Sequence, residues 1–247
     1  MILAGVDLAW FPDKNPTAIA TGDLINSVLT VVDIQPAVFG IQNILSTLIR
    51  TESLQGEAID ASLIINNETG QRPCEKKVSK VYGSRYASCH ASNRKLYPNA
   101  ASVHLSQELE SLGYMHLSAN KFQIECYPHP AIIEIFGLPE RLKYKKGRVL
   151  EKKSGQKVLA SLIRSLSGNN VLKLDVPAEF DLYFDEDHID SLKGKTLKSN
   201  EDALDAIVCL YIAGLYAVGA EGRAYGDTGS GYVWIPASVY RLLSCTS

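Results

Sequence analysis

Four acidic residues at or near the ends of apolar runs are the part of this sequence best suited to chemistry. Asp7 closes the run ILAGVD, Asp60 lies in EAIDASLII, and Glu125 follows KFQI. Asp205 lies in the long apolar segment NEDALDAIVCLYIAGLYAVG, with Asp202 three residues before it. An unpaired carboxylate in an apolar interior is strongly destabilising or takes up a proton. Four such residues on elements that could converge indicate a site for a hard divalent cation.

The chemistry that fits such a cluster is phosphodiester cleavage. Two divalent cations can activate a water molecule and stabilise the leaving oxygen, and Mg²⁺ prefers oxygen ligands. If their strands are neighbours, Asp7, Asp60 and Glu125 can face one edge of a sheet. A later helix would bring Asp202 and Asp205 to that edge, because residues three apart share a helix face. We therefore expect Mg²⁺ or Mn²⁺ as cofactor, with Asp202 as an auxiliary metal ligand and the other four as catalytic metal ligands.

Each strand acid also has a structural alternative. Asp7 could cap the turn after its strand, and Asp60 could accept hydrogen bonds from a neighbouring loop. Glu125 could form a salt bridge with one of three basic residues, namely Arg72, Arg85 or Lys143.

The two helix acids differ in their alternatives. With Ser199 or Asn200 as the N-cap, Asp202 would lie near the N3 position, where an acid meets free N–H groups and the helix dipole. Asp205 lies beyond that cap, so a buried salt bridge is its main alternative.

The apolar runs that carry these acids predict an α/β fold. The segments ILAGVDLA, TAIATGDL and SVLTVVDI have the length of strands, and the second and third are rich in β-branched residues, which suggests hairpins. VFGIQNILSTLIR has helical spacing, and EAIDASLII is apolar on both faces, as in a central strand. KFQIECY predicts a further strand, and PHPAIIEIF a short helix that begins with proline.

The remaining segments predict an insertion and a helical C-terminal part. A polar and basic insertion occupies about residues 66–115 and includes a helix near its end. A helix with an apolar stripe around Leu159 follows, and residues 170–198 have an irregular pattern of mixed charge. The segment 199–247 predicts a long helix from Ser199 or Asn200, a short strand and a closing amphipathic turn. We expect one domain over residues 1–247.

Positive charge is dense in only two stretches, one in the insertion and one after PHPAIIEIF. Near the carboxylates these side chains would contact phosphate groups of a substrate. The residues predicted to do so are Arg72, Lys76, Arg85, Lys143 and Lys145. Nearby tyrosines could stack on unpaired bases, namely Tyr82, Tyr86, Tyr97 and Tyr144. The alternative for both stretches is an ordinary solvated surface.

Composition and short motifs argue against several classes of protein. A net charge of −2 argues against attraction of nucleic acid to the whole surface. Five cysteines without a CxxC pair argue against a zinc knuckle and a disulfide framework. The sequence lacks a P-loop motif, a signal-peptide pattern and an apolar run of about 20 residues, so we expect a cytoplasmic protein without a membrane span.

Several motifs together resemble a known family. GVDLAW, AIDASL, IECYPHPA, DALDAIVCLYIAG and GYVWIP are similar to motifs of a predicted-nuclease family, domain of unknown function 429, over about residues 3–236. That family is assigned to the RNase H-like superfamily. The resemblance implies a mixed five-stranded sheet with its first three strands antiparallel, flanked by helices. It also implies acidic positions at Asp7, Asp60, Glu125 and Asp205, and the pair Asp202 and Asp205 is similar to the DxxD of resolvase-type members.

One departure concerns Ser62, where the commoner family pattern has proline. The leading hypothesis is a nuclease or phosphodiesterase that hydrolyses nucleic acid with carboxylate-held divalent cations. One alternative is a phosphohydrolase that acts on a small nucleotide or phosphate ester. The other is a non-catalytic binding or scaffold protein in which the carboxylates form structural salt bridges.

Overall fold

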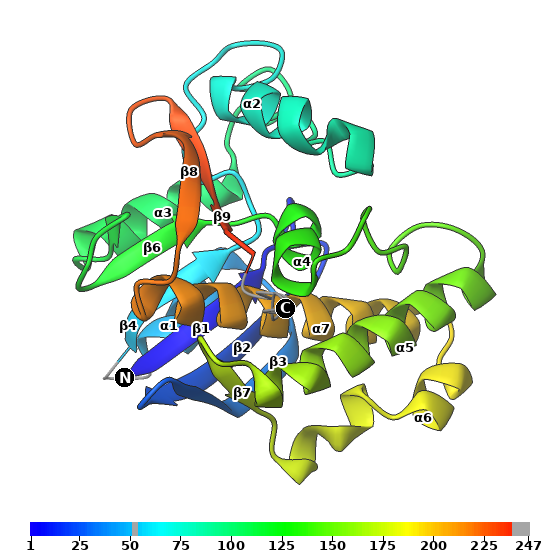
Figure 1. Cartoon of the computed structure of the whole chain (residues 1–247). Helices are drawn as coiled ribbons and strands as arrows, with labels where there is room; N and C mark the ends of the chain where they lie inside the picture. The colour runs from blue at the N-terminus through cyan, green and yellow to red at the C-terminus, as the bar shows by residue number, and fades with distance from the viewer. Residues whose placement is uncertain (51–53, 239–247) are drawn as a thin grey trace, which may run out of the picture.

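The structure is a computed structural model, and it describes residues 1–50 and 54–238. Its centre is a sheet with the strand order β5-β6-β4-β1-β2-β3-β7, and β8 and β9 form a separate hairpin (Figure 1). The strands are β1 (Ile2–Asp7), β2 (Thr17–Ile25), β3 (Val28–Val38), β4 (Leu54–Ile59), β5 (Met115–His116), β6 (Phe122–Glu125), β7 (Lys173–Asp175), β8 (Gly222–Asp227) and β9 (Gly231–Pro236).

The sheet is mixed, as expected. The pairs β1–β2 and β2–β3 are antiparallel, whereas β1–β4 and β4–β6 are parallel. The five predicted strands are therefore present, and β6, β4 and β1 are neighbours. The short strands β5 and β7 extend the two edges of the sheet. This arrangement confirms the α/β class and is consistent with an RNase H-like fold.

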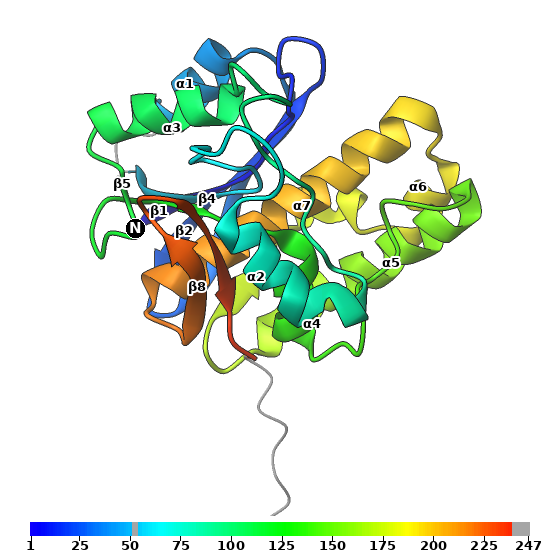
Figure 2. The same cartoon turned by 90° about the horizontal axis from the view of Figure 1, so that it is seen from above.

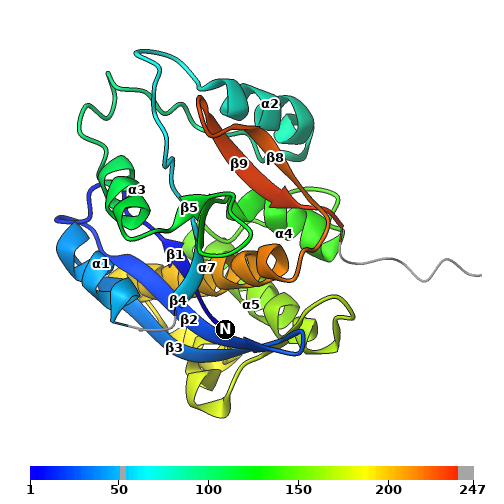
Figure 3. The same cartoon turned by 90° about the vertical axis from the view of Figure 1, so that its left-hand side faces the viewer.

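Helices cover both faces of the sheet (Figure 3). The helices are α1 (Ile41–Ile49), α2 (Pro73–Tyr82), α3 (Ala101–Ser111), α4 (Pro128–Phe136), α5 (Val149–Ser165), α6 (Glu186–Ser191) and α7 (Gly194–Ala217). α1 and α3 pack on one face, and α7 packs on the other against β1, β2, β3 and β4. The insertion helix α2 packs on the β8–β9 hairpin, beside the core sheet (Figure 2).

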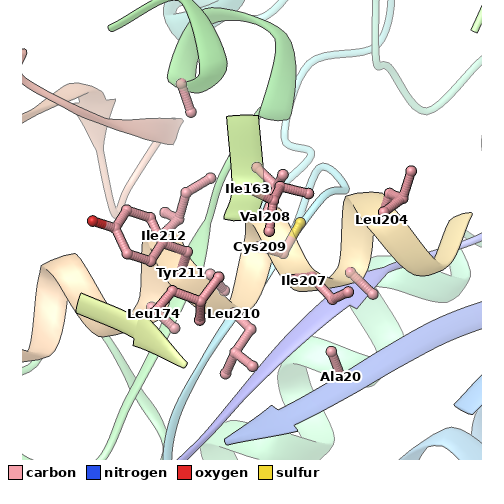
Figure 4. Close-up of a cluster of buried hydrophobic side chains, with 14 of the residues drawn as sticks. Ala20, Ile163, Leu174, Leu204, Ile207, Val208, Cys209, Leu210, Tyr211 and Ile212 are labelled. Carbon is pink, nitrogen blue, oxygen red and sulfur yellow. The ribbon is translucent and has the colours of Figure 1, made fainter. Parts of the chain in front are cut away.

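The helix α7 forms the centre of the larger core. Every residue from Ala203 to Leu215 is buried, and Asp205 is the one charged residue among them, which is the pattern of a helix segment buried on all sides. Figure 4 shows Ile207 and Leu210 among the core side chains, with Ala20 of β2 and Ile163 of α5 nearby. A side chain on Gly5 would collide with the α7 backbone, so this glycine permits β1 and α7 to touch directly.

Two expectations about the C-terminal part were wrong. α7 begins at Gly194, and its N-cap is Lys193, so neither Ser199 nor Asn200 caps it. The segment 170–198 is not irregular, because it contains β7, a 3₁₀ helix over Ala178–Tyr183, and α6. The predicted closing turn falls largely on residues 239–247, which lie outside the described residues. None of the described helices combines the length and apolar character needed to cross a membrane.

Candidate carboxylate site

The strand register determines which acids share a face of the sheet. Val6 pairs with Ile59, and Ile59 pairs with Glu125, so these three side chains point to the same face. Val6 and Ile59 belong to the core cluster under α1 and α3. Since side chains alternate along a strand, Asp7 and Asp60 are directed to the opposite face, toward α7. Glu125 therefore points away from Asp7 and Asp60.

The helix α7 adds two more acids on its own side of the sheet. Asp205 is fully buried, and Tyr144 donates a hydrogen bond to its Oδ1 at 2.6 Å. Lys145 Nζ lies 2.5 Å from Asp205 Oδ2 and 3.8 Å from Asp60 Oδ2. The dipeptide Tyr144–Lys145 thus reaches the carboxylates from the segment between α4 and α5. A buried pair of this kind is the alternative foreseen for Asp205, although here it lies inside the acidic cluster.

Asp202 belongs to the same cluster. Its side chain forms a hydrogen bond with that of Asp7, and burial raises the pKa of both carboxyl groups. Lys198 forms ion pairs with Asp202, one turn further along α7, and with Glu201. Because α7 begins at Gly194, Asp202 lies well past the first turn and does not cap the helix. The capping alternative for Asp202 was therefore wrong.

Crowding and burial shift the pKa values of these acids upward. Burial raises the pKa of Asp7 to about 6, with Lys145 opposing the shift and Asp202 adding to it. Burial raises the pKa of Asp60 to about 8, again against the influence of Lys145. For Lys145, burial disfavours the charge, but Asp205 and its neighbours raise the pKa well above the usual value. The two lysines at the site, Lys145 and Lys198, do not balance the charge of Asp7, Asp60, Asp202 and Asp205, so protons neutralise part of that charge.

Glu125 takes part in a different network, centred on Arg72. Arg72 Nη2 lies 2.5 Å from Glu125 Oε1, and Nη1 lies 2.9 Å from Glu125 Oε2. The same guanidinium donates to Glu75 Oε1, to the Ser62 hydroxyl and to the Ile64 carbonyl. These bonds use all five of its N–H groups. The structure thus contains the salt bridge with Arg72 that was the alternative for Glu125, and the role of Glu125 as a metal ligand stays a prediction.

The predicted phosphate contacts are dispersed. Arg72 is buried, with 1% of its surface exposed, and is therefore not available to a substrate. Arg85 pairs with Glu134 and donates to backbone carbonyls after α4. Lys76 is exposed on α2, and Lys143 is exposed on the segment before α5. Of the five cations, Lys145 alone is brought to the carboxylates, where it contacts acids in place of phosphate.

A pocket of about 560 Å³ opens above the carboxylates. Asp7, Asp60 and Lys145 lie in its wall, and so do the buried side chains of the Arg72 network, namely Arg72, Glu75 and Glu125. Its lining also includes the aromatic residues Trp10, Tyr86 and Tyr127, the cations Arg141 and Lys146, and the histidines His90 and His129. Its size is within the range of about 300–1,000 Å³ that is usual for small-ligand sites.

The carboxylate oxygens of the cluster suit a hard cation such as Mg²⁺, but in this structure they surround the ammonium group of Lys145. Asp205 Oδ2 is buried and has no hydrogen bond of normal geometry, although Lys145 forms an ion pair with it. Carboxylate oxygens with raised pKa values are ligands that a divalent cation can take over from protons. Within residues 1–50 and 54–238, no group of three His, Cys, Asp or Glu side chains is positioned to hold a metal ion directly. Metal loading would therefore require Lys145 to move.

The comparison with protein families gives a clear result. The sequence model described as "Protein of unknown function (DUF429)" matches residues 5–228. This chain belongs to the DUF429 family. Neither a comparison with curated proteins nor one with solved structures finds a match. The family predicted from the sequence motifs is thus confirmed. The matched residues include the four acids of the cluster, namely Asp7, Asp60, Asp202 and Asp205.

Two residues that contact the clustered acids were not predicted from the sequence to do so. Tyr144 was considered as a base-stacking residue, but it is fully buried and binds Asp205. Lys198 was not considered, although its spacing of four residues from Asp202 is the spacing at which side chains meet on a helix.

Proposed function

We propose that this DUF429 protein is a divalent-metal-dependent phosphodiesterase that acts on nucleic acid. One observation carries the proposal: Asp7, Asp60 and Asp205 come from three separate elements and meet on one face of the sheet. Crowding several buried carboxylates at one place is costly and raises their pKa values, and such perturbed groups are common at functional sites. Here Lys145 forms ion pairs with both Asp60 and Asp205 and acts electrostatically on Asp7, and the pKa values of Asp7 and Asp60 are raised.

The residues divide into distinct roles. Asp7, Asp60 and Asp205 would hold Mg²⁺ or Mn²⁺, with Asp202 as the auxiliary ligand. When bound, the metal would supply an activated water and a positive charge for the leaving oxygen. Tyr144 fixes the Asp205 carboxylate through Oδ1, which leaves Oδ2 directed at the site. Lys145 neutralises the acids in the metal-free protein and, once released, is placed to contact a substrate phosphate.

Metal binding and cleavage test the proposal together. Wild-type protein should bind Mn²⁺ in titration calorimetry and cleave a fluorescent single-stranded oligonucleotide when Mn²⁺ or Mg²⁺ is added. Asp7→Asn with Asp205→Asn should abolish both. Asp187→Asn, an exposed site on α6, serves as the matched control and should retain both. Wild-type cleavage by the double variant, or no Mn²⁺ binding at millimolar concentration by the wild type, would contradict the proposal.

The size of the pocket favours a second candidate, hydrolysis of a small nucleotide or another phosphate ester by the same acids. A pocket of about 560 Å³ could enclose such a substrate. A panel of mononucleotides and simple phosphate esters, measured beside the oligonucleotide with the same metals, separates the two candidates. Faster turnover of the small esters would favour the second.

A further inference from the structure

The wall of the pocket places aromatic rings beside cations and acids. Trp10 lies three residues after Asp7, at the start of the loop between β1 and β2, and both line the pocket. Trp10 stacks on Tyr97 with 4.0 Å between ring centroids and 16° between ring planes. This contact supports the indole from one side, yet 38% of the Trp10 surface remains exposed. A large ring that is supported and still accessible is a ready platform for another flat ring.

A second aromatic ring comes from the insertion. Tyr86 lines the same pocket and is 60% exposed. Its backbone has a φ of 60°, in the left-handed region that a non-glycine residue rarely adopts. The other tyrosines considered for stacking are not free to do so: Tyr82 and Tyr144 are buried, and Tyr97 supports Trp10.

A group of cations lines the pocket near the same acids. Lys145, Lys146 and Arg141 come from the segment between α4 and α5, and all three line the pocket. Burial and then these three cations lower the pKa of His129, a further lining residue, to about 3, so positive charge is concentrated there. The buried Nδ1 of His129 has no hydrogen-bond partner among the described residues. A phosphate oxygen next to these cations would be stabilised, and a neutral ring nitrogen can accept a hydrogen bond from a sugar hydroxyl or a base.

We infer that this pocket is a nucleotide subsite in which one unpaired base stacks on Trp10 while its phosphate lies between Arg141 or Lys146 and the carboxylates. The inference rests on the proposed function and narrows its substrate to single-stranded nucleic acid or a strand end. A base within a duplex has both faces covered by its neighbours, so it would have to leave the stack to reach Trp10. Stacking of an unpaired base on an aromatic side chain contributes about 1–3 kcal/mol.

Binding can be measured separately from cleavage. The probe is a short fluorescein-labelled oligothymidylate, titrated by anisotropy against metal-free Asp7→Asn protein at low salt. Adding Trp10→Ala should weaken binding by about 5- to 150-fold, the equivalent of the stacking contribution. Trp10→Phe should retain most of the affinity, because the phenyl ring can still stack. Phe39→Ala removes an exposed aromatic residue that does not line the pocket and should leave binding unchanged.

Intrinsic fluorescence gives an independent readout. The chain has two tryptophans, and Trp234 is 5% exposed and packs against Tyr216. The oligothymidylate should therefore quench Trp10 emission in a Trp234→Phe background, and a blunt duplex of the same length should quench it less. Undiminished binding by the Trp10→Ala variant, or equal affinity for the duplex, would overturn the subsite. Weakened binding by Trp10→Ala without any metal-dependent cleavage by the wild type would support the subsite and contradict the proposed function.

Discussion

Replacement of Arg72 by methionine is the perturbation whose effect the structure defines most closely. The change keeps a long side chain and removes the guanidinium that joins Glu125 of β6 to Glu75 of α2. Both carboxylates are buried and would lose their cationic partner. Removing one partner of a buried ion pair costs about 3–5 kcal/mol, because the remaining charge is left without compensation.

That free energy converts into a large change in melting temperature. For a protein of this size 1 kcal/mol corresponds to about 2–4 °C, so Arg72→Met should lower the Tm by about 6–20 °C near neutral pH. Arg85→Met is the matched control. Its ion pair with Glu134 is partly exposed and is worth at most about 1 kcal/mol.

The loss should also depend on pH. Burial already raises the pKa of Glu125 above its ordinary 4.5, and Arg72 opposes that rise. Without Arg72 the folded-state pKa rises further, so the folded protein holds a proton that the unfolded chain releases above about pH 4.5. The stability of the variant therefore falls as pH rises, and the Tm deficit should be larger at pH 8 than at pH 5.

Circular dichroism melts at the two pH values provide the measurement, with ionic strength held constant. A deficit below about 2 °C at pH 8, or an equal deficit at both pH values, would refute the view that Arg72 compensates buried charge. The double variant Arg72→Met with Glu125→Met removes the stranded carboxylate and should recover part of the lost Tm.

Three other outcomes follow from the described geometry. Affinity for Mn²⁺ should rise by up to about tenfold per pH unit between pH 6 and 8, because the metal must displace protons from Asp7 and Asp60, whose pKa values are about 6 and 8. Calorimetry in buffers of different ionisation enthalpy would count the protons released, and an affinity that does not change with pH would contradict these raised pKa values. Glu57→Gln should raise the Tm at pH 8, and this gain should disappear toward pH 4.5. The reason is that the buried Glu57 carboxyl has no hydrogen-bond partner among the described residues, and burial raises its pKa well above 4.5. A variant less stable than the wild type at pH 8 would contradict this prediction. Gly5→Ala should lower the Tm by more than about 5 °C, because the added methyl group collides with the α7 backbone. Gly168→Ala is the control and should change the Tm little, because the space around Gly168 is open.

The fold could be predicted largely because the apolar runs specify the central elements. The order of strands and helices through β4, and the positions of β6 and α4, agree with the hydrophobic pattern. The start of α7 was misplaced because Gly194 and the polar residues after it have no apolar periodicity. Of residues 194–198 only Leu197 is buried, so this first turn of the helix carries almost no hydrophobic signal in the sequence.

The position of Glu125 could have been deduced in part from strand alternation. Phe122 and Ile124 are apolar and face α7, so Glu125 must share the other face with Gln123. Arg72 could be named only as one of three candidate partners of Glu125, because it lies in an insertion whose sequence carries no period. Nor could the contact of Lys145 with the acids be identified, because that residue reaches them from a loop.

The direct contact between β1 and α7 at Gly5 also bears on how the protein is made. The strand that ends in Asp7 is synthesised early, whereas the helix that carries Asp205 leaves the ribosome only after most of the described chain has been translated. Until then the α7 face of β1 has no cover, and Asp7 and Asp60 cannot be brought together with Asp202 and Asp205, which both lie on α7. Contacts between residues so far apart in the sequence are slow to form, because the entropy of closing the intervening loop must be overcome first. A nascent chain would therefore remain unable to assemble the complete carboxylate site until its last core helix has docked.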